Sequence, residues 1–181
     1  HPSTDGGMWC FVLAHNDSAT ALENVSAQVT LIDANGNQVA SQPALLILNI
    51  LSPNTSLPMT VFFNAPLPAD MTPQVQILTA IQLQANDARY LPASAQNILV
   101  QVDWNGHSAQ VSGQIFLPAE SKAAASVWVA ATAYDELGQV VGVRRWEGGE
   151  IPPGTSLPFT MTVSSLGGEI DHVEVVVEAR P

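Results

Sequence analysis

The residues of this chain that could do chemistry are scattered rather than grouped. The four histidines, at positions 1, 15, 107 and 172, show no short spacing to one another or to cysteine, whereas zinc sites usually rest on such spacings. The four methionines do not cluster with them either, and Met59 and Met161 occupy apolar positions of an alternating pattern. The sequence therefore predicts no zinc or copper site and no resident cofactor.

One short segment contains the residue types of a catalytic triad. Asp103, His107 and Ser108 lie close together in the sequence, but Ser108 follows His107 directly in a predicted tight hairpin, where neighbouring side chains point apart. No strand–nucleophile–helix elbow surrounds the serine. Paired carboxylates elsewhere lie in glycine-rich loops, and general acid–base catalysis needs a desolvated pocket that separates their pKa values. We predict that the chain is not an enzyme.

Two groups of residues are candidates for ligand binding. Acidic loops at the ends of a β-sandwich can supply the six to eight oxygen ligands that Ca²⁺ prefers. The candidate calcium ligands are Glu147, Glu150, Glu169 and Asp171. Solvated loop charge is the interpretation that we favour for these four acids.

The second candidate group is aromatic. Trp128 and Tyr134 share a predicted strand face with Thr132, and Trp146 follows nearby. Exposed aromatic side chains on a sheet stack against sugar rings, which makes these three aromatics a candidate ligand or interface surface. We favour the alternative that they fill the core or pack at a domain junction. Their exposure to solvent distinguishes the two.

The composition excludes several classes of partner. Five Lys and Arg against 16 Asp and Glu give a net charge of −11, which repels nucleic acid and anionic lipid headgroups. The longest apolar runs, 8–14 and 44–48, are far shorter than the roughly 20 residues of a transmembrane helix. We therefore expect no nucleic-acid binding and no membrane insertion. The single cysteine, Cys10, excludes an intrachain disulfide, and its apolar neighbours favour a buried, unreactive thiol.

The sequence contains an internal duplication, and its repeated segments form the strands and turns that position the candidate residues. Residues 53–60 match residues 153–160 at six of eight positions after a shift of 100, and residues 31–36 align with 133–138 after a shift of 102. Apolar and polar residues alternate along the flanking segments, as in 25–31 and 156–163, which is typical of half-buried strands in a two-layer sandwich. Strands are expected near 8–14, 24–32, 37–47, 56–63 and 74–84, and near 97–104, 109–117, 126–134, 139–146, 156–163 and 172–179.

The turns between these strands have recognisable chemistry. Pro53-Asn54 and Pro153-Gly154 predict type II turns, and the segments 33–36 and 135–138 predict hairpins with Asp at the start and Gly at positive φ. Asn105-Gly106 predicts a two-residue type I′ turn. The first copy has no counterpart of residues 98–102, so either the sequence starts after that strand or the first module is built without it.

These patterns predict an all-β protein made of two tandem immunoglobulin-like antiparallel β-sandwich modules. The predicted boundaries are 1–85 for the first module, 86–96 for a linker and 97–181 for the second module.

The duplicated segments 29–33 (VTLID) and 131–135 (ATAYD) resemble the motif of FxLYD-type modules. Asn16, the valines at 25 and 127, the glycine after each aspartate and the Pro-Gly turn before a phenylalanine strand fit the same frame. These modules are immunoglobulin-like domains of secreted and surface proteins of bacteria and archaea. The resemblance implies a β-sandwich in an exported protein and brings no catalytic residues.

The Gln-, Asn-, Ser- and Thr-rich, Lys-poor composition also favours an exported bacterial protein. The first residues show no export signal, so we expect a secreted, cell-surface or periplasmic protein whose signal lies outside this sequence. The sequence predicts a non-catalytic structural or interaction module, whose partner would be a protein or glycan at the cell surface. The alternative is a carbohydrate- or calcium-binding module.

Overall fold

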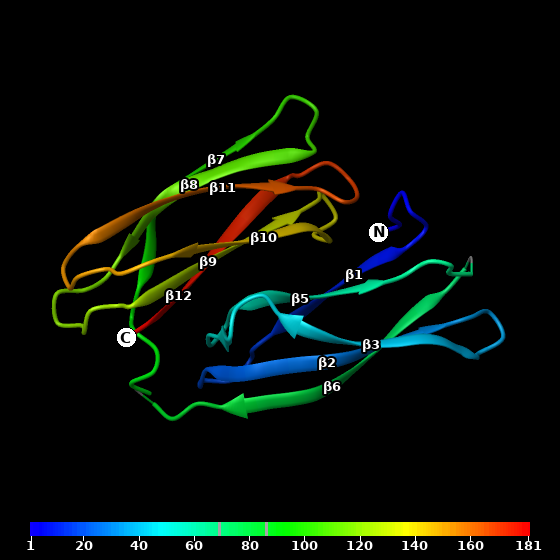
Figure 1. Cartoon of the computed structure of the whole chain (residues 1–181), viewed down its shortest axis with the longest axis horizontal. Helices are drawn as coiled ribbons and strands as arrows, with labels where there is room; N and C mark the ends of the chain where they lie inside the picture. The colour runs from blue at the N-terminus through cyan, green and yellow to red at the C-terminus, as the bar shows by residue number, and fades with distance from the viewer. Residues whose placement is uncertain (69, 86) are drawn as a thin grey trace. The chain divides into compact units, whose positions relative to one another are not determined.

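The computed structural model describes residues 1–68, 70–85 and 87–181 (Figure 1). This described part of the chain contains twelve β-strands and no helix, and it divides into two compact units, His1–Leu83 and Gln84–Pro181. The predicted fold class, all-β with antiparallel immunoglobulin-like sandwiches, is confirmed. No helix among the described residues is long and apolar enough to cross a membrane.

Unit 1 is built from six strands. They are β1 (Met8–His15), β2 (Leu22–Ile32), β3 (Gln38–Leu46), β4 (Ile50–Leu51), β5 (Ser56–Phe63) and β6 (Thr72–Gln82). β2 pairs with β3 and β4 on one side and with β6 on the other, while β5 pairs with β1. The end of β3 also pairs with β5, so β3 links two layers that face each other across the core.

The core of unit 1 follows from period-two alternation along two of these strands. Every second residue of β2 from Val25 to Leu31 is buried, and so is every second residue of β5 from Leu57 to Phe63. The residues of β2 that alternate with these buried ones, such as Gln28, are partly exposed. The predicted alternation over 25–31 is therefore confirmed.

Unit 2 is a sandwich of two three-stranded sheets. Its strands are β7 (Ser94–Val102), β8 (Ser108–Phe116), β9 (Ser126–Tyr134), β10 (Val140–Gly148), β11 (Ser156–Ser164) and β12 (His172–Arg180). One sheet has the order β10-β9-β12 and the other has the order β11-β8-β7 (Figure 1). Side chains of all six strands contribute to a single core, and fully buried residues include Val111, Val129 and Val163.

The predicted turns are only partly correct. Asn54 and Gly154 have φ of 53° and 73°, as the type II prediction requires, and Gly36 and Gly138 have φ of 84° and 72°. The type I′ prediction at Asn105-Gly106 is wrong, because Asn105 does not have a positive φ. Gly106 N–H instead donates to the Asp103 carbonyl at 3.1 Å, which closes a four-residue turn.

The segment that precedes β7 belongs to unit 2. Of the predicted linker 86–96, Asn86 lies outside the described residues and residues 94–96 already form the start of β7. Leu91 N–H donates to the Ala179 carbonyl at 2.9 Å, and the Leu91 side chain packs against the core of unit 2.

Candidate functional site

Asp103, His107 and Ser108, the residues of the candidate catalytic triad, form a hydrogen-bonded turn and not a proton relay. The Ser108 hydroxyl donates to Asp103 Oδ2 at 2.8 Å, and the backbone N–H groups of His107 and Ser108 donate to Asp103 Oδ1 at 3.1 and 3.2 Å. The Ser108 hydroxyl and these N–H groups lower the pKa of Asp103 below its usual value. A serine nucleophile needs its hydroxyl bonded to a base such as imidazole. In this turn the hydroxyl is bonded to an ionised carboxylate that caps the hairpin.

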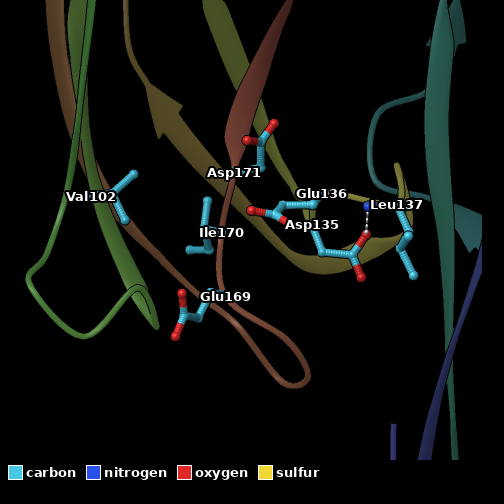
Figure 2. Close-up of a pocket in the computed structure, with 7 residues that line it drawn as sticks. All are labelled: Val102, Asp135, Glu136, Leu137, Glu169, Ile170 and Asp171. Carbon is cyan, nitrogen blue, oxygen red and sulfur yellow. Dashed lines mark hydrogen bonds between the residues drawn. The ribbon is translucent and has the colours of Figure 1, made fainter.

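One pocket of the described residues is acidic and lies within unit 2 (Figure 2). It has a volume of about 550 Å³ and is bordered by the β9–β10 loop, the segment before β12 and the end of β7. The lining residues are Val102, Asp135, Glu136, Leu137, Glu169, Ile170 and Asp171. Two of the four calcium candidates, Glu169 and Asp171, therefore line the same pocket as two further acids, Asp135 and Glu136.

Two of the four carboxylates in this pocket have structural partners. Asp135 Oδ1 accepts hydrogen bonds from the backbone N–H groups of Leu137 at 3.0 Å, as Figure 2 shows, and of Gln139 at 2.8 Å. Asp171 Oδ2 lies 2.8 Å from Nδ1 of His172. Among the described residues no group of three or more His, Cys, Asp and Glu is arranged to hold a metal ion. The pocket is a concentration of negative charge, without a formed coordination shell.

The other two calcium candidates lie at the opposite end of unit 2. Glu147 pairs with Trp128 near the start of β9, and Glu150 follows in the loop beyond β10. Asp171 N–H, in contrast, donates to the carbonyl of Tyr134, six residues further along β9. Six residues of extended strand span about 20 Å. Glu147 and Glu150 therefore cannot bind the same calcium ion as Glu169 and Asp171, and calcium binding by either pair of acids stays a prediction.

The three candidate aromatic side chains do not form a row. Trp146 pairs with Val129 on the core side of its sheet and packs against Phe159, with ring centroids 6.0 Å apart. Trp128 and Tyr134 alternate along β9 with the core residues Val129, Ala131 and Ala133, so they lie on the other side of the same sheet. These three side chains therefore do not form one flat surface, because Trp146 lies on the opposite side of the sheet from the other two.

Tyr134 is almost completely buried, although it lies on the side of the sheet that faces away from the core. Its side chain is 5% exposed and its ring stacks on His172, with centroids 5.0 Å apart and an interplanar angle of 13°. Its hydroxyl donates to Glu174 Oε2 at 3.3 Å. Burial, together with the neighbouring negative charge and hydrogen bond of Glu174, raises the pKa of Tyr134 to about 12. The phenol is a neutral structural group at physiological pH.

Sequence reasoning missed three exposed apolar side chains in the loops at the pocket end of unit 2. Trp104 is 96% exposed, Leu137 is 81% exposed and Leu166 is 45% exposed. The signal for Trp104 was present in the sequence, because a tryptophan between Asp103 and Asn105 lies inside a turn and has no strand face to cover it.

No family model matches this chain, and no curated protein matches it.

Proposed function

We propose that this chain is a non-catalytic part of an exported protein, with a structural or binding role outside the cytoplasm. It consists of two copies of one immunoglobulin-like module of the FxLYD type. The observation that carries the proposal is that the duplicated polar residues serve backbone geometry in both units. Asp33 accepts the N–H groups of Asn35 and Asn37 at 2.9 and 2.8 Å, as Asp135 does in its own loop.

The strand pairings support the same proposal. β2 pairs with β3 and β6 in unit 1, as β9 pairs with β10 and β12 in unit 2. The motif segments 29–33 and 131–135 both lie at the end of these central strands. A module whose shared residues are turn caps and core side chains brings no reaction chemistry of its own, and function then depends on the surfaces it presents.

Asn16, part of the FxLYD frame, has a structural role in unit 1. It is 1% exposed, and its Nδ2 donates to the carbonyls of Thr20 at 2.9 Å and of Leu51 at 3.0 Å. Its Oδ1 accepts both the backbone N–H and the hydroxyl of Ser18. Buried polar side chains that are fully hydrogen-bonded fix loop geometry, and this use of Asn16 supports the resemblance.

Cell fractionation tests the location. An antibody against the purified chain is used on cytoplasmic, periplasmic, surface and secreted fractions of the source cells. We expect the protein outside the cytoplasm, and binding of the purified chain to a cell-surface protein or glycan. Recovery of the protein only with cytoplasmic markers would overturn the proposal.

The alternative function, calcium or carbohydrate binding, has one specific observation in its favour, which is the acidic pocket of unit 2. Isothermal titration with Ca²⁺ and with soluble surface polysaccharides tests it. For calcium, the double variant Glu169→Gln/Asp171→Asn removes two pocket carboxylates. Glu147→Gln/Glu150→Gln removes two carboxylates from the other end and is the matched control. Calcium binding that only the first double variant abolishes would establish this alternative.

A further inference from the structure

Trp104 is the most exposed large apolar side chain of the described residues. It is 96% exposed and lies in the turn between β7 and β8, which Gly106 N–H closes by donating to the Asp103 carbonyl at 3.1 Å. This backbone bond and the Asp103 carboxylate hold the turn, so the turn does not depend on the indole ring. An indole ring in water contributes nothing to packing, and tryptophan is enriched where proteins bind one another. The ring is therefore available to a partner.

Leu137 is a second exposed apolar side chain at the same end of unit 2, and unit 1 shows that its turn does not require it. Leu137 is 81% exposed, and its N–H donates to Asp135 Oδ1 at 3.0 Å. In the equivalent turn of unit 1, the N–H of Asn35 donates to Asp33 Oδ1 at 2.9 Å. Asparagine is a residue that turns favour, whereas leucine is not. The geometry of the turn therefore does not account for the leucine.

The two turns border one surface, because the loop between β11 and β12 lies against both. Ile170 N–H donates to the Gly106 carbonyl at 2.8 Å, and a Cβ atom at Gly106 would lie 2.8 Å from Cγ of Glu169. Glu169 and Ile170 line the acidic pocket together with Leu137. Figure 2 shows Val102, at the end of β7, on one side of this pocket and Leu137 on the other. We call Trp104, Leu137 and the pocket that their turns border the loop surface of unit 2.

The loop surface carries negative charge that its own loops do not neutralise. The loops 103–107, 135–139 and 165–171 contain five Asp and Glu and no Lys or Arg. Within the described part of the chain, Glu136 and Glu169 form no hydrogen bond and no ion pair. Apolar side chains beside such carboxylates are complementary to a partner that places basic side chains next to apolar ones.

Other kinds of partner fit the loop surface less well. Nucleic acid and anionic lipid carry phosphate charge, which the carboxylates repel. A calcium ion alone binds oxygen ligands and gives no role to Trp104 and Leu137. A neutral glycan stacks on an indole ring but leaves the carboxylate charge unopposed. A neutral membrane accepts the apolar side chains but removes water from the charged carboxylates beside them, which is costly.

We propose that the loop surface of unit 2 binds a protein segment that carries Arg or Lys side chains next to apolar ones. The apolar side chains of the segment pack against Trp104 and Leu137, and a basic side chain enters the pocket of about 550 Å³ beside Glu136 and Glu169. Arg in particular can also stack on the indole ring.

This inference deepens the proposed interaction role and rests on it, since it names the surface and the chemistry of the partner. Its failure is distinguishable from failure of the proposed function, because cellular location is measured independently of peptide binding.

The test uses the full chain and three synthetic peptides, acetylated and amidated at their ends. The first peptide alternates Arg and Leu, the second has Ser in place of Leu, and the third has Glu in place of Arg. Isothermal titration measures binding, and the indole N–H signal of Trp104 in NMR spectra reports where the peptide binds. We expect saturable binding of the first peptide with a shift of this signal, weaker binding of the second and none of the third. Binding of the first peptide should weaken as salt is added, because exposed charges are screened.

Variants of the chain distinguish the loop surface from general attraction to an acidic protein. Trp104→Ala removes a side chain that packs against nothing, and Leu137→Asn introduces the residue that unit 1 has in the equivalent turn. Leu45→Asn is the matched control, because Leu45 is 62% exposed and lies in unit 1. We expect Trp104→Ala to weaken binding of the first peptide about tenfold or more, as loss of a central interface tryptophan does. Leu137→Asn should weaken it as well, and Leu45→Asn should leave it unchanged. Circular dichroism checks that the variants are folded.

A second pair of variants tests the contribution of charge. Glu136→Gln/Glu169→Gln removes two carboxylates from the pocket and should weaken binding severalfold and reduce its salt dependence. Glu147→Gln/Glu150→Gln, at the opposite end of unit 2, should do neither.

Several outcomes would overturn the proposal. They are the absence of saturable binding, equal binding of the first two peptides, and binding that Trp104→Ala and Leu137→Asn leave unchanged. Phosphatidylcholine vesicles, a soluble neutral polysaccharide and the chain itself, in analytical ultracentrifugation, are tested in parallel. If one of these binds in a Trp104-dependent way while the first peptide does not bind, the proposal is also wrong, because the occupant is then a membrane, a glycan or a second copy.

Discussion

Arg180 and Tyr90 join the two ends of the polypeptide stretch that forms unit 2. The guanidinium carbon of Arg180 lies 4.9 Å from the centroid of the Tyr90 ring, and Nη2 donates to the Tyr90 hydroxyl at 3.2 Å. The same guanidinium donates through Nε to Glu178 at 2.8 Å and lies 5.5 Å from the centroid of Trp128. The segment before β7 is thereby attached to the last strand of the sandwich.

Replacement of Tyr90 tests this attachment. We expect Tyr90→Ala to lower the free energy of unfolding of unit 2 by about 1–2 kcal/mol, since it removes a cation–π contact and a hydrogen bond. Tyr90→Phe keeps the ring and is expected to lose less than half of that amount. Urea denaturation, followed by tryptophan fluorescence, measures both variants. If the two variants lost equal stability, the ring contact with Arg180 would have no energetic role.

The ion pair between Asp87 and Arg89, in the same segment, leads to a prediction about the pKa of the Asp87 carboxyl group, which NMR can measure. Arg89 Nε lies 3.0 Å from Asp87 Oδ1, and Nη2 lies 2.7 Å from Oδ2. The hydrogen bonds from the Arg89 side chain, and then from its backbone N–H, lower the pKa of Asp87 to about 2. Arg89→Gln should raise this pKa towards 3.8 but not fully to it, because the backbone donor remains.

The sign of the linked change in stability follows from this shift. The folded pKa of Asp87 is lower than the unfolded pKa, so the folded state binds fewer protons between the two values. The stabilisation is present above about pH 4 and is lost as the pH falls towards about 2. Arg89→Gln should therefore flatten the decline in stability in that range. An unchanged Asp87 titration in this variant would contradict the assigned cause.

The pKa of Tyr134 is raised rather than lowered, so we expect its contribution to stability to be lost at alkaline pH. Its pKa is raised to about 12, so the folded state retains a proton that the unfolded state releases near pH 10. Its contribution to stability is present below about pH 10 and is lost as the pH rises towards 12. Glu174→Gln should lower the pKa of Tyr134 without restoring the usual value, because burial remains the largest cause. Ultraviolet difference titration in a Tyr90→Phe background isolates the signal of this phenol.

The sequence predicts the strands well, because period-two alternation reports directly which face of a sheet is buried. The five strands expected in 8–84 and the six expected in 97–179 are all present, and among the described residues only the two-residue strand β4 was not predicted. The hairpin at Asn105-Gly106 was misassigned because Asp103 accepts N–H groups of His107 and Ser108, which moves the turn by one residue. Local turn propensities do not include such hydrogen bonds from backbone N–H groups to a side-chain carboxylate.

The sites were harder to predict than the strands. The acidic pocket combines Val102, Asp135 and Glu169, which come from three separate segments of the chain. These segments meet because the two sheets of unit 2 pack against each other. The exposure of Val75 and Ile77 was not predicted either, although they lie opposite the buried residues Val29 and Ala27. Sequence patterns give the face of a strand but not its covering layer.

A pair of glycine substitutions tests how closely the two sheets of unit 2 approach each other. Gly142 lies at a bulge in β10, and a Cβ atom there would collide with the backbone carbonyl of Ser164 in β11. A Cβ atom at Gly149 would meet nothing within 4 Å, and neither glycine has a positive φ. These two positions, in the same segment of chain, are therefore a matched pair.

We expect Gly142→Ala to reduce the free energy of unfolding by about 1–3 kcal/mol, because backbone atoms must move apart to accept the methyl group. Gly149→Ala should change it by less than about 0.5 kcal/mol, or stabilise the fold slightly by restricting the unfolded chain. Urea denaturation of both variants, with amide exchange of β10 and β11 as a second measurement, provides the comparison. Similar stability of the two variants, with unchanged exchange, would show that the close approach at Ser164 does not constrain the sandwich.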